Sequence, residues 1–334
     1  MRGPVPGTLP AVLRILPGLC PALVFLTTLW PLCEEPGPSS IPARPTAKGP
    51  VAETPAAKPA PPAPAKGETA AGETAAGKTG GGNIGAWKPI FRGVEHATAE
   101  AKAPRPLRLH AVRVDLTDPD IDFLVTPPNR RRAGQTDGLK TSTFLTKHSC
   151  QVAVNASPFR PVGAVEGEPR DILGLSISRG ERYSKEEEGR GVLLIDKDRK
   201  ARVSRPPVDM SKAYNAMGGF GLLLEDGRNV GEDDALHPRT AVGISKDGRY
   251  LIILVIDGRQ PGWSDGATTA ETAEWLRSFG AEQGLNLDGG GSTTLVVSDG
   301  KGGAKVMNRP IHAGIPGTER VNGNHLGVFA KPLK

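Results

Sequence analysis

The sequence predicts an α+β fold with a large, mixed β-sheet at its core and a few flanking helices. Short apolar runs recur along the chain after residue 100, and Gly, Pro, Asp and Asn separate them in the manner of strands and turns. Only two segments have helical patterns. One run, 251–256, is apolar at every position, which is typical of a strand buried on both faces. Strands therefore outnumber helices.

The sequence patterns assign the expected elements to defined residue ranges. Strands are expected at 107–114, 121–125, 151–155, 173–178, 191–195, 220–224, 240–245, 250–256, 285–287, 293–297 and 326–329, with a hairpin after Arg179-Gly180. Helices are expected at 141–149 and 268–281. Thr268 and Glu271 have the spacing of a capping box, which marks the start of the second helix.

The first 33 residues resemble an export signal or a short signal anchor. Arg2 and Arg14 precede a largely apolar stretch that prolines interrupt, a pattern that suits export better than a stable membrane span. Cys33 raises lipid attachment as an alternative, which Leu32 disfavours because it is a poor lipobox residue. We therefore expect an exported protein that is periplasmic, anchored to the cell envelope or secreted, with a membrane tether where this segment is retained.

Residues 34–85 predict a disordered linker. They are rich in Pro, Ala, Gly, Lys, Glu and Thr, and the piece at 67–71 recurs at 72–76. Such a composition buries too little apolar surface to offset chain entropy, so we expect a semi-extended tether. Residues 86–334 follow as one folded domain, long enough to bury a sizeable core.

Charge and cysteine content exclude some functions. The net charge of +6 is mild, and no basic stripe carries interleaved aromatics, so nucleic-acid binding is not expected. Of the three cysteines, only Cys150 lies in the folded region, which leaves no internal disulfide there. We expect Cys150 to be a buried, unreactive thiol.

The segment from Asp288 to Thr293 is the most informative motif. An apolar strand pattern ends in Asp288, and Gly289, Gly290 and Gly291 follow before Ser292 and Thr293. It lacks the Lys of a phosphate loop, the G-x-G-x-x-G spacing of a dinucleotide site and the G-x-S-x-G of a nucleophile elbow. Bare backbone beside a carboxylate and hydroxyls predicts a small-molecule site. A β-bulge or tight turn is the structural alternative.

The triplet Asp-Gly-Arg occurs three times, in different settings. Asp226 and Asp247 lie where hairpin turns are expected. Asp257 instead follows the fully apolar run, and no matching strand comes directly after it. A functional role for Asp257 or Arg259 and a plain turn both remain open at this point.

Two further arginines and the absence of metal motifs complete the site candidates. Arg239 precedes a strand and Arg320 lies near the end of the chain, and arginine suits planar recognition of phosphate or carboxylate. An ordinary solvated loop is the alternative for Arg239. The six histidines show no pair at zinc-binding spacing. We expect no cofactor, and a calcium or magnesium ion on Asp288 or Asp257 stays open.

These motifs together resemble the phosphodiester glycosidase family, whose bacterial members are often labelled exopolysaccharide-related. The resemblance is carried by Pro238-Arg239-Thr240-Ala241, Val255-Ile256-Asp257-Gly258-Arg259, Asn286-Leu287-Asp288-Gly289-Gly290-Gly291-Ser292-Thr293-Thr294 and Glu319-Arg320-Val321-Asn322, in that order. Where the family tends to have Asn-Gly-Gly-aromatic-Phe, this chain has Asn155-Ala156-Ser157-Pro158-Phe159. Asn155 and Phe159 match that pattern, and the glycines do not.

The resemblance implies hydrolysis of a sugar joined through its anomeric oxygen to a phosphodiester, on an anionic glycan outside the cytoplasm. Asp288 and Asp257 are then the candidate catalytic carboxylates. The implied substrate-binding set is Arg239, Arg320, Arg259, Asn155, Asn322, Thr293 and the backbone N–H groups of Gly289, Gly290, Gly291 and Ser292. Asn155 and Asn322 would bind sugar hydroxyls.

Two other functional classes stay open on the sequence alone. A wall- or exopolysaccharide-binding module without turnover fits the tether equally well. An exopolysaccharide assembly factor that acts through protein partners is the third, and it predicts a large exposed apolar patch.

Overall fold

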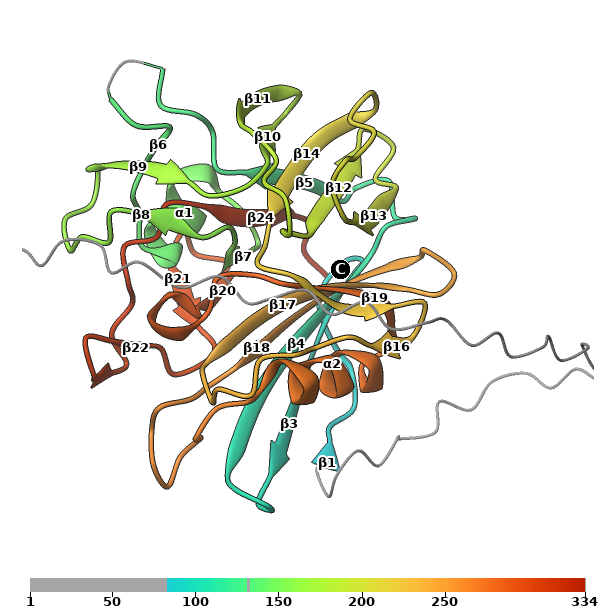
Figure 1. Cartoon of the computed structure of the whole chain (residues 1–334), viewed down its shortest axis with the longest axis vertical. Helices are drawn as coiled ribbons and strands as arrows, with labels where there is room; N and C mark the ends of the chain where they lie inside the picture. Colours follow the sequence, from blue (N-terminus) through green and yellow to red (C-terminus); the bar gives the residue numbers. More distant parts are fainter. Residues whose placement is uncertain (1–82, 131–132, 334) are drawn as a thin grey trace, which may run out of the picture. The chain divides into compact units, whose positions relative to one another are not determined.

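The computed structural model describes residues 83–130 and 133–333 (Figure 1). The predicted export segment, and the predicted linker up to residue 82, lie outside these residues. The last residues assigned to the linker are an exception, because β1 (Asn83–Ile84) pairs with β3 (Val94–Ala101) in the central sheet. The folded region therefore begins before residue 86. Among the described residues, no helix has the length and apolar character needed to cross a membrane.

The central sheet has nine strands and is built around β18, the fully apolar run. Its order is β1, β3, β4 (Leu107–Asp115), β18 (Tyr250–Ile256), β17 (Arg239–Ser245), β19 (Ala281–Asn286), β15 (Leu222–Glu225) and β16 (Arg228–Asn229), with β2 (Lys88–Phe91) paired to β3.

Two five-stranded sheets and two small ones complete the fold. The first runs β21 (Ala304–Val306), β20 (Leu295–Ser298), β7 (Val152–Asn155), β24 (His325–Phe329) and β5 (Asp122–Val125). The second runs β11 (Glu181–Ser184), β10 (Ser176–Ser178), β14 (Ala213–Gly218), β12 (Val192–Asp196) and β13 (Ala201–Ser204). The small sheets are β6 (Thr136–Asp137), β9 (Pro169–Ile172) and β8 (Phe159–Arg160), and β22 (Ile311–His312) with β23 (Ile315–Pro316).

The prediction of a β-rich fold with few helices is confirmed, and the prediction of a mixed sheet is wrong. All the named strand pairs of the described residues are antiparallel. Parallel pairs need a long crossover, usually a helix, and only α1 (Thr141–His148) and α2 (Thr269–Ser278) occur in this part of the chain.

Strand β18 divides the core into two layers, as its sequence predicts. Leu251, Ile253 and Val255 pack with residues of the two five-stranded sheets, whereas Ile252 and Leu254 pack on the opposite face with α2. Successive side chains of a strand point to opposite faces, so a strand covered on both sides must be apolar throughout.

Helix α2 starts as predicted and ends earlier. The Thr268 hydroxyl accepts the Glu271 N–H at 3.1 Å and the Glu271 carboxylate accepts the Thr268 N–H at 2.9 Å, the predicted capping box. The predicted end at Ala281 is wrong because Gly280 adopts φ +106° and Ala281 already belongs to β19.

Helix α1 covers the first five-stranded sheet and shields Cys150. The thiol is 1% exposed, and a side chain on Gly327 of β24 would collide with its sulfur. Burial raises the pKa of Cys150 to about 12. The prediction of a buried thiol is confirmed, and its raised pKa is in keeping with low reactivity.

Candidate functional site

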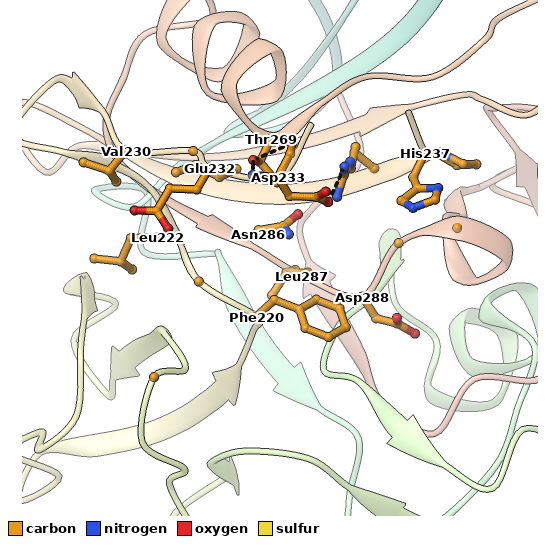
Figure 2. Close-up of a pocket in the computed structure, with 18 of the residues that line it drawn as sticks. Phe220, Leu222, Val230, Glu232, Asp233, His237, Thr269, Asn286, Leu287 and Asp288 are labelled. Carbon is orange, nitrogen blue, oxygen red and sulfur yellow. Dashed lines mark hydrogen bonds and ion pairs between the residues drawn. The ribbon is translucent and has the colours of Figure 1, made fainter. Parts of the chain in front are cut away.

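A cavity of about 590 Å³ opens at one edge of the central sheet, where β19 ends and β15 and β17 begin (Figure 2). Its wall carries the glycine segment, Asp288, and the guanidinium groups of Arg259 and Arg320. The rest of the wall includes Phe220, Leu222, Val230, Glu232, Asp233, His237, Arg239, Asn286 and Leu287. The antiparallel pairing of β15 and β17 with β19 brings these distant segments to the same edge.

Asp288 is held at the cavity by its own backbone. Its N–H donates to the Ala156 carbonyl at 2.9 Å, and its carbonyl accepts the Asn155 side-chain amide at 2.6 Å. The carboxylate is bonded to the Ser292 hydroxyl and the Gly289 N–H and remains partly exposed to the cavity. Burial disfavours the charged form and raises the pKa of Asp288 to about 6, although Ser292 and Arg320 act against this. Such a carboxyl changes protonation near neutral pH.

Close neighbours leave no room for side chains in the glycine segment. A side chain on Gly289 would lie 2.7 Å from the Pro238 carbonyl oxygen, and one on Gly291 would collide with the Arg320 guanidinium. Gly290 adopts φ +60° at the start of the short 3₁₀ helix η1 (Gly290–Ser292). Bare backbone therefore lets the arginines approach the loop that carries Asp288.

The predicted nest of backbone N–H groups is largely absent. Gly289 donates to the Asp288 carboxylate, Gly290 to the Pro238 carbonyl at 2.8 Å, and Ser292 to the Gly289 carbonyl at 3.1 Å. Within the described residues, only the Gly291 N–H of these four has no protein acceptor. An anion here must be bound mainly by side chains.

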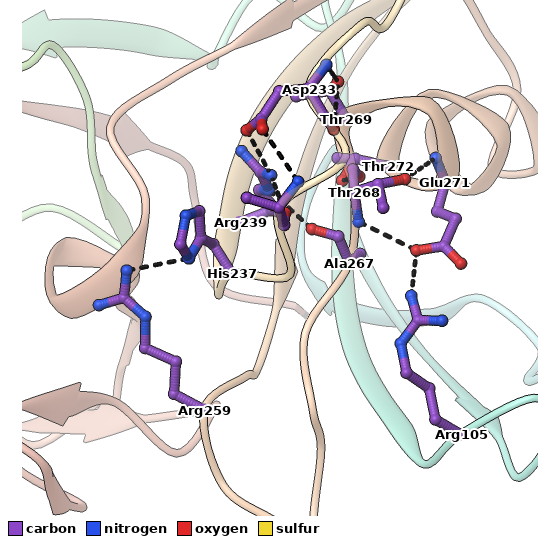
Figure 3. Close-up of polar contacts among 11 residues, drawn as sticks. Arg105, Asp233, His237, Arg239, Arg259, Ala267, Thr268, Thr269, Glu271 and Thr272 are labelled. Carbon is purple, nitrogen blue, oxygen red and sulfur yellow. Dashed lines mark hydrogen bonds and ion pairs between the residues drawn. The ribbon is translucent and has the colours of Figure 1, made fainter.

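Arg259 and Arg320 supply those side chains. Arg320 Nη1 donates to the Ser292 hydroxyl at 3.2 Å, and its Nε to His312 Nδ1 at 3.3 Å. Arg259 Nη2 donates to His237 Nδ1 at 3.0 Å (Figure 3). In the described part of the chain, neither guanidinium forms an ion pair with a carboxylate. Neither positive charge at the glycine segment is held in a direct ion pair, although the charge of Arg320 interacts with the Asp288 carboxyl.

Arg239 lines the cavity and is also bonded to the loop beside it. It is 5% exposed, and its guanidinium donates to the carbonyls of Ala267 and Ala235 and to the Asp233 carboxylate (Figure 3). The Asp233 ion pair is 2.9 Å long. Two of the three guanidinium nitrogens, Nε and Nη2, donate to these acceptors, so Arg239 fixes the 233–237 loop beside the cavity. Its role as a phosphate ligand stays a prediction.

Asp257 is not among the residues that line the cavity, and its role as a catalytic carboxylate stays a prediction. It is 2% exposed. Oδ1 accepts from the Asn308 amide and the Arg309 N–H, both at 3.0 Å, and Oδ2 accepts from the Trp263 indole N–H at 3.0 Å. Burial raises the pKa of Asp257, and these hydrogen bonds lower it. Its oxygens have no capacity left for a substrate.

Three other predicted ligands hold the loop instead of facing the cavity. Asn155 is fully buried and bonds Asp288, Thr240 and Thr294. Asn322 is 1% exposed and donates to the Ser292 carbonyl at 3.2 Å. Thr293 is 1% exposed, and its hydroxyl accepts from Thr240 at 3.3 Å. They determine where Asp288 and η1 lie, and none lines the cavity.

Three residues of the cavity wall were not predicted from the sequence as site residues: Phe220, Asn286 and His237. Phe220 is 46% exposed at the cavity wall, and its N–H donates to the Asn286 carbonyl at 2.8 Å. The Asn286 side-chain oxygen is buried without a hydrogen-bond partner. A lone aromatic between glycines, and an amide ending an apolar strand, were the available signals.

The described residues contain no group of three or more His, Cys, Asp or Glu side chains arranged to hold an ion.

Comparison with known families identifies the chain's relatives. The profile of the phosphodiester glycosidase family matches residues 148–329, more than half of the chain. The chain belongs to this family. Comparison with curated proteins found no match.

Solved structures show a similar fold. The catalytic domain of zebrafish N-acetylglucosamine-1-phosphodiester alpha-N-acetylglucosaminidase, auto-inhibited by its pro-peptide, is 19% identical with a TM-score of 0.55, over 75% of this chain and 89% of that one. A Burkholderia pseudomallei protein provisionally named as exported is 16% identical with a TM-score of 0.50, over 70% of this chain and 77% of that one. At these identities the likeness is one of fold.

Proposed function

We propose that the protein hydrolyses a sugar-1-phosphate diester at this cavity, on an extracytoplasmic glycan or glycoconjugate. The observation that carries the proposal is the shared cavity wall of Asp288, whose pKa is raised to about 6, and two arginines that have no carboxylate partner. Family membership supports a glycosidase-type hydrolase, and the export-like N-terminal sequence supports the location.

The reaction needs an anion site and one well-placed carboxylate. Arg259, Arg320 and the Gly291 N–H would bind the phosphodiester. A phosphate monoester is a good leaving group, so the demand for a separate general acid is small. Ionised Asp288 would attack or activate water at the anomeric carbon, with Ser292 fixing its orientation.

The sugar would lie between Phe220 and Asn286. An exposed aromatic ring offers an apolar face for a pyranose ring. The unpartnered Asn286 oxygen would accept a hydrogen bond from a sugar hydroxyl or amide N–H, since a buried acceptor without a partner costs free energy. A sugar bound there would lie on the same cavity wall as the Asp288 carboxylate, which Figure 2 shows near the Phe220 ring.

The test supplies the methyl diester of a sugar-1-phosphate and measures the reducing sugar released. Asp288→Asn should lower kcat by about 1000-fold, the range expected for loss of a catalytic carboxylate. Asp226→Asn is the matched control, because Asp226 also precedes a glycine after an apolar strand but lies in an exposed hairpin turn with φ +49°. Unchanged release by Asp288→Asn would refute the assignment. Binding of the diester without any release by the wild type would instead favour the non-catalytic glycan-binding class.

A further inference from the structure

Each of the two arginines that face the glycine segment donates a hydrogen bond to a histidine ring. Arg259 donates to His237 Nδ1 at 3.0 Å, and Arg320 donates to His312 Nδ1 at 3.3 Å. Several other arginines of the described residues are instead held by carboxylates, including Arg105 by Glu271, Arg190 by Glu187 and Arg239 by Asp233. Figure 3 shows both kinds of partner close together, with Arg239 on Asp233 and Arg259 on His237.

The hydrogen bonds determine the protonation of both rings. A guanidinium can only donate, so Nδ1 of each histidine must carry no proton and the ring must be neutral with hydrogen on Nε2. The surroundings agree with this. The pKa of His237 is lowered by burial and by the charges of Arg259 and Arg239, although the charge of Asp233 acts against this. The pKa of His312 is lowered by burial and by the charge of Arg320.

Both histidines are themselves well anchored. The His237 backbone exchanges hydrogen bonds with Ala267, and a side chain on Gly258 or Gly266 would collide with that backbone. His312 belongs to β22, which is paired with β23. Each histidine therefore has a defined backbone position. His237 lies on the cavity wall, and His312 lies behind Arg320, which does line the cavity.

A neutral acceptor has an electrostatic consequence that a carboxylate would not have. It orients a guanidinium through a hydrogen bond and leaves its full charge available. A carboxylate in the same place would orient it and also cancel much of its field, as Asp233 does for Arg239.

We propose that His237 and His312 are positioning residues, which aim Arg259 and Arg320 at the phosphodiester as neutral acceptors and so preserve the positive charge of the site. The proposal rests on the proposed function, because it assigns the anion to the phosphate of that substrate. It explains why the site selects an anionic substrate without a cluster of backbone donors.

The test replaces each histidine by a neutral acceptor, by a charged acceptor and by a residue with no acceptor. His237→Asn and His237→Asp place an oxygen near the position of Nδ1, and the two differ only in charge. His237→Ala removes the acceptor. The same three changes are made at His312. The dissociation constant of dimethyl phosphate, which keeps a single negative charge, is measured near neutral pH for each variant by calorimetry.

The proposal predicts that the asparagine variants stay within about two-fold of the wild type. The aspartate and alanine variants should bind at least about five-fold more weakly, the effect of losing one charge-assisted hydrogen bond. Equal affinities for the asparagine and aspartate variants would show that charge is irrelevant. Asparagine variants as weak as alanine would show that the acceptor is irrelevant. Either result overturns the proposal.

A double-mutant cycle distinguishes positioning from a general effect on folding. In an Arg259→Ala background, His237→Ala should cause no further loss of dimethyl phosphate binding, since the group it positions is gone. A further loss equal to that in the wild type would contradict the proposal. His96→Asn, on β3 and outside the cavity, is the control and should bind like the wild type.

The binding measurement does not depend on turnover. A protein that releases no sugar but shows the asparagine–aspartate difference would refute the proposed hydrolysis and support the histidine roles. A protein that releases sugar and shows no such difference would do the reverse.

Discussion

Asp257 and Asp288 follow strands of the same sheet, β18 and β19, and each precedes a glycine, yet their surroundings are opposite. Both oxygens of Asp257 are occupied by neutral donors from Trp263, Asn308 and Arg309. Asp288 keeps part of its carboxylate open to a cavity that also contains two arginines.

The difference comes from the side chains of the loop that follows each aspartate. After Asp257, the chain returns Trp263 to cover the carboxylate. After Asp288, three glycines bring no side chain, so the space is left for Arg320 and for a ligand. A carboxylate at a strand end is thus either a structural acceptor or a reactive group, and the next few residues decide which.

The largest expected effect is on stability, from Asp257→Asn. An amide has one acceptor oxygen, so its NH₂ group would face a buried donor that Asp257 now satisfies, and the free energy of unfolding should fall by about 3 kcal/mol. The free energy of unfolding is measured from a urea unfolding curve near neutral pH. In the same measurement, Asp288→Asn should show no such loss. A loss of similar size in both variants would remove the distinction between the two carboxylates.

The second effect is the pH dependence of stability at Asp288. Its folded pKa of about 6 lies above the ordinary unfolded value, so the folded state binds the proton more tightly and stability declines as pH rises between the two values. Asp288→Asn carries no such titration. The variant should therefore gain about 2 kcal/mol over the wild type between about pH 4 and pH 7. A constant difference across that range would argue against a raised pKa.

The smallest effect sharpens the role of the glycines. The methyl group of Gly291→Ala would displace the Arg320 guanidinium, which is the free end of a flexible side chain, so the fold should persist. We expect KM for the diester to rise about ten-fold, the loss of one charge-assisted contact, with little change in kcat. In an Arg320→Ala background the same change should add nothing, and a further ten-fold rise there would mean that Gly291 acts by another route.

Strand and helix positions were largely predictable because their signals are local. The all-apolar pattern of 251–256, the hairpin turns at Asp226 and Asp247 and the capping box at Thr268 each specify a structure within a few residues. Strand β3 was missed because its buried side chains are mostly alanines, which give weak alternation.

The site was only partly predictable because it depends on contacts between distant segments. The glycine segment predicted a small-molecule site at Asp288, and Asp288 does line the cavity. Nothing local shows that Asp257 is covered by Asn308, that Arg239 is held by Asp233, or that His237 holds Arg259. Those partners are set by antiparallel pairing and by loops that meet only in the folded chain.

The buried Cys150 bears on where such a domain can fold. Its thiol hardly ionises, and Gly327 and α1 enclose it, so it is shielded from oxidants, thiol reagents and other cysteines. The folded region contains no second cysteine. The domain therefore needs no disulfide to reach its native state, and an oxidising compartment offers this thiol no partner cysteine within the folded region.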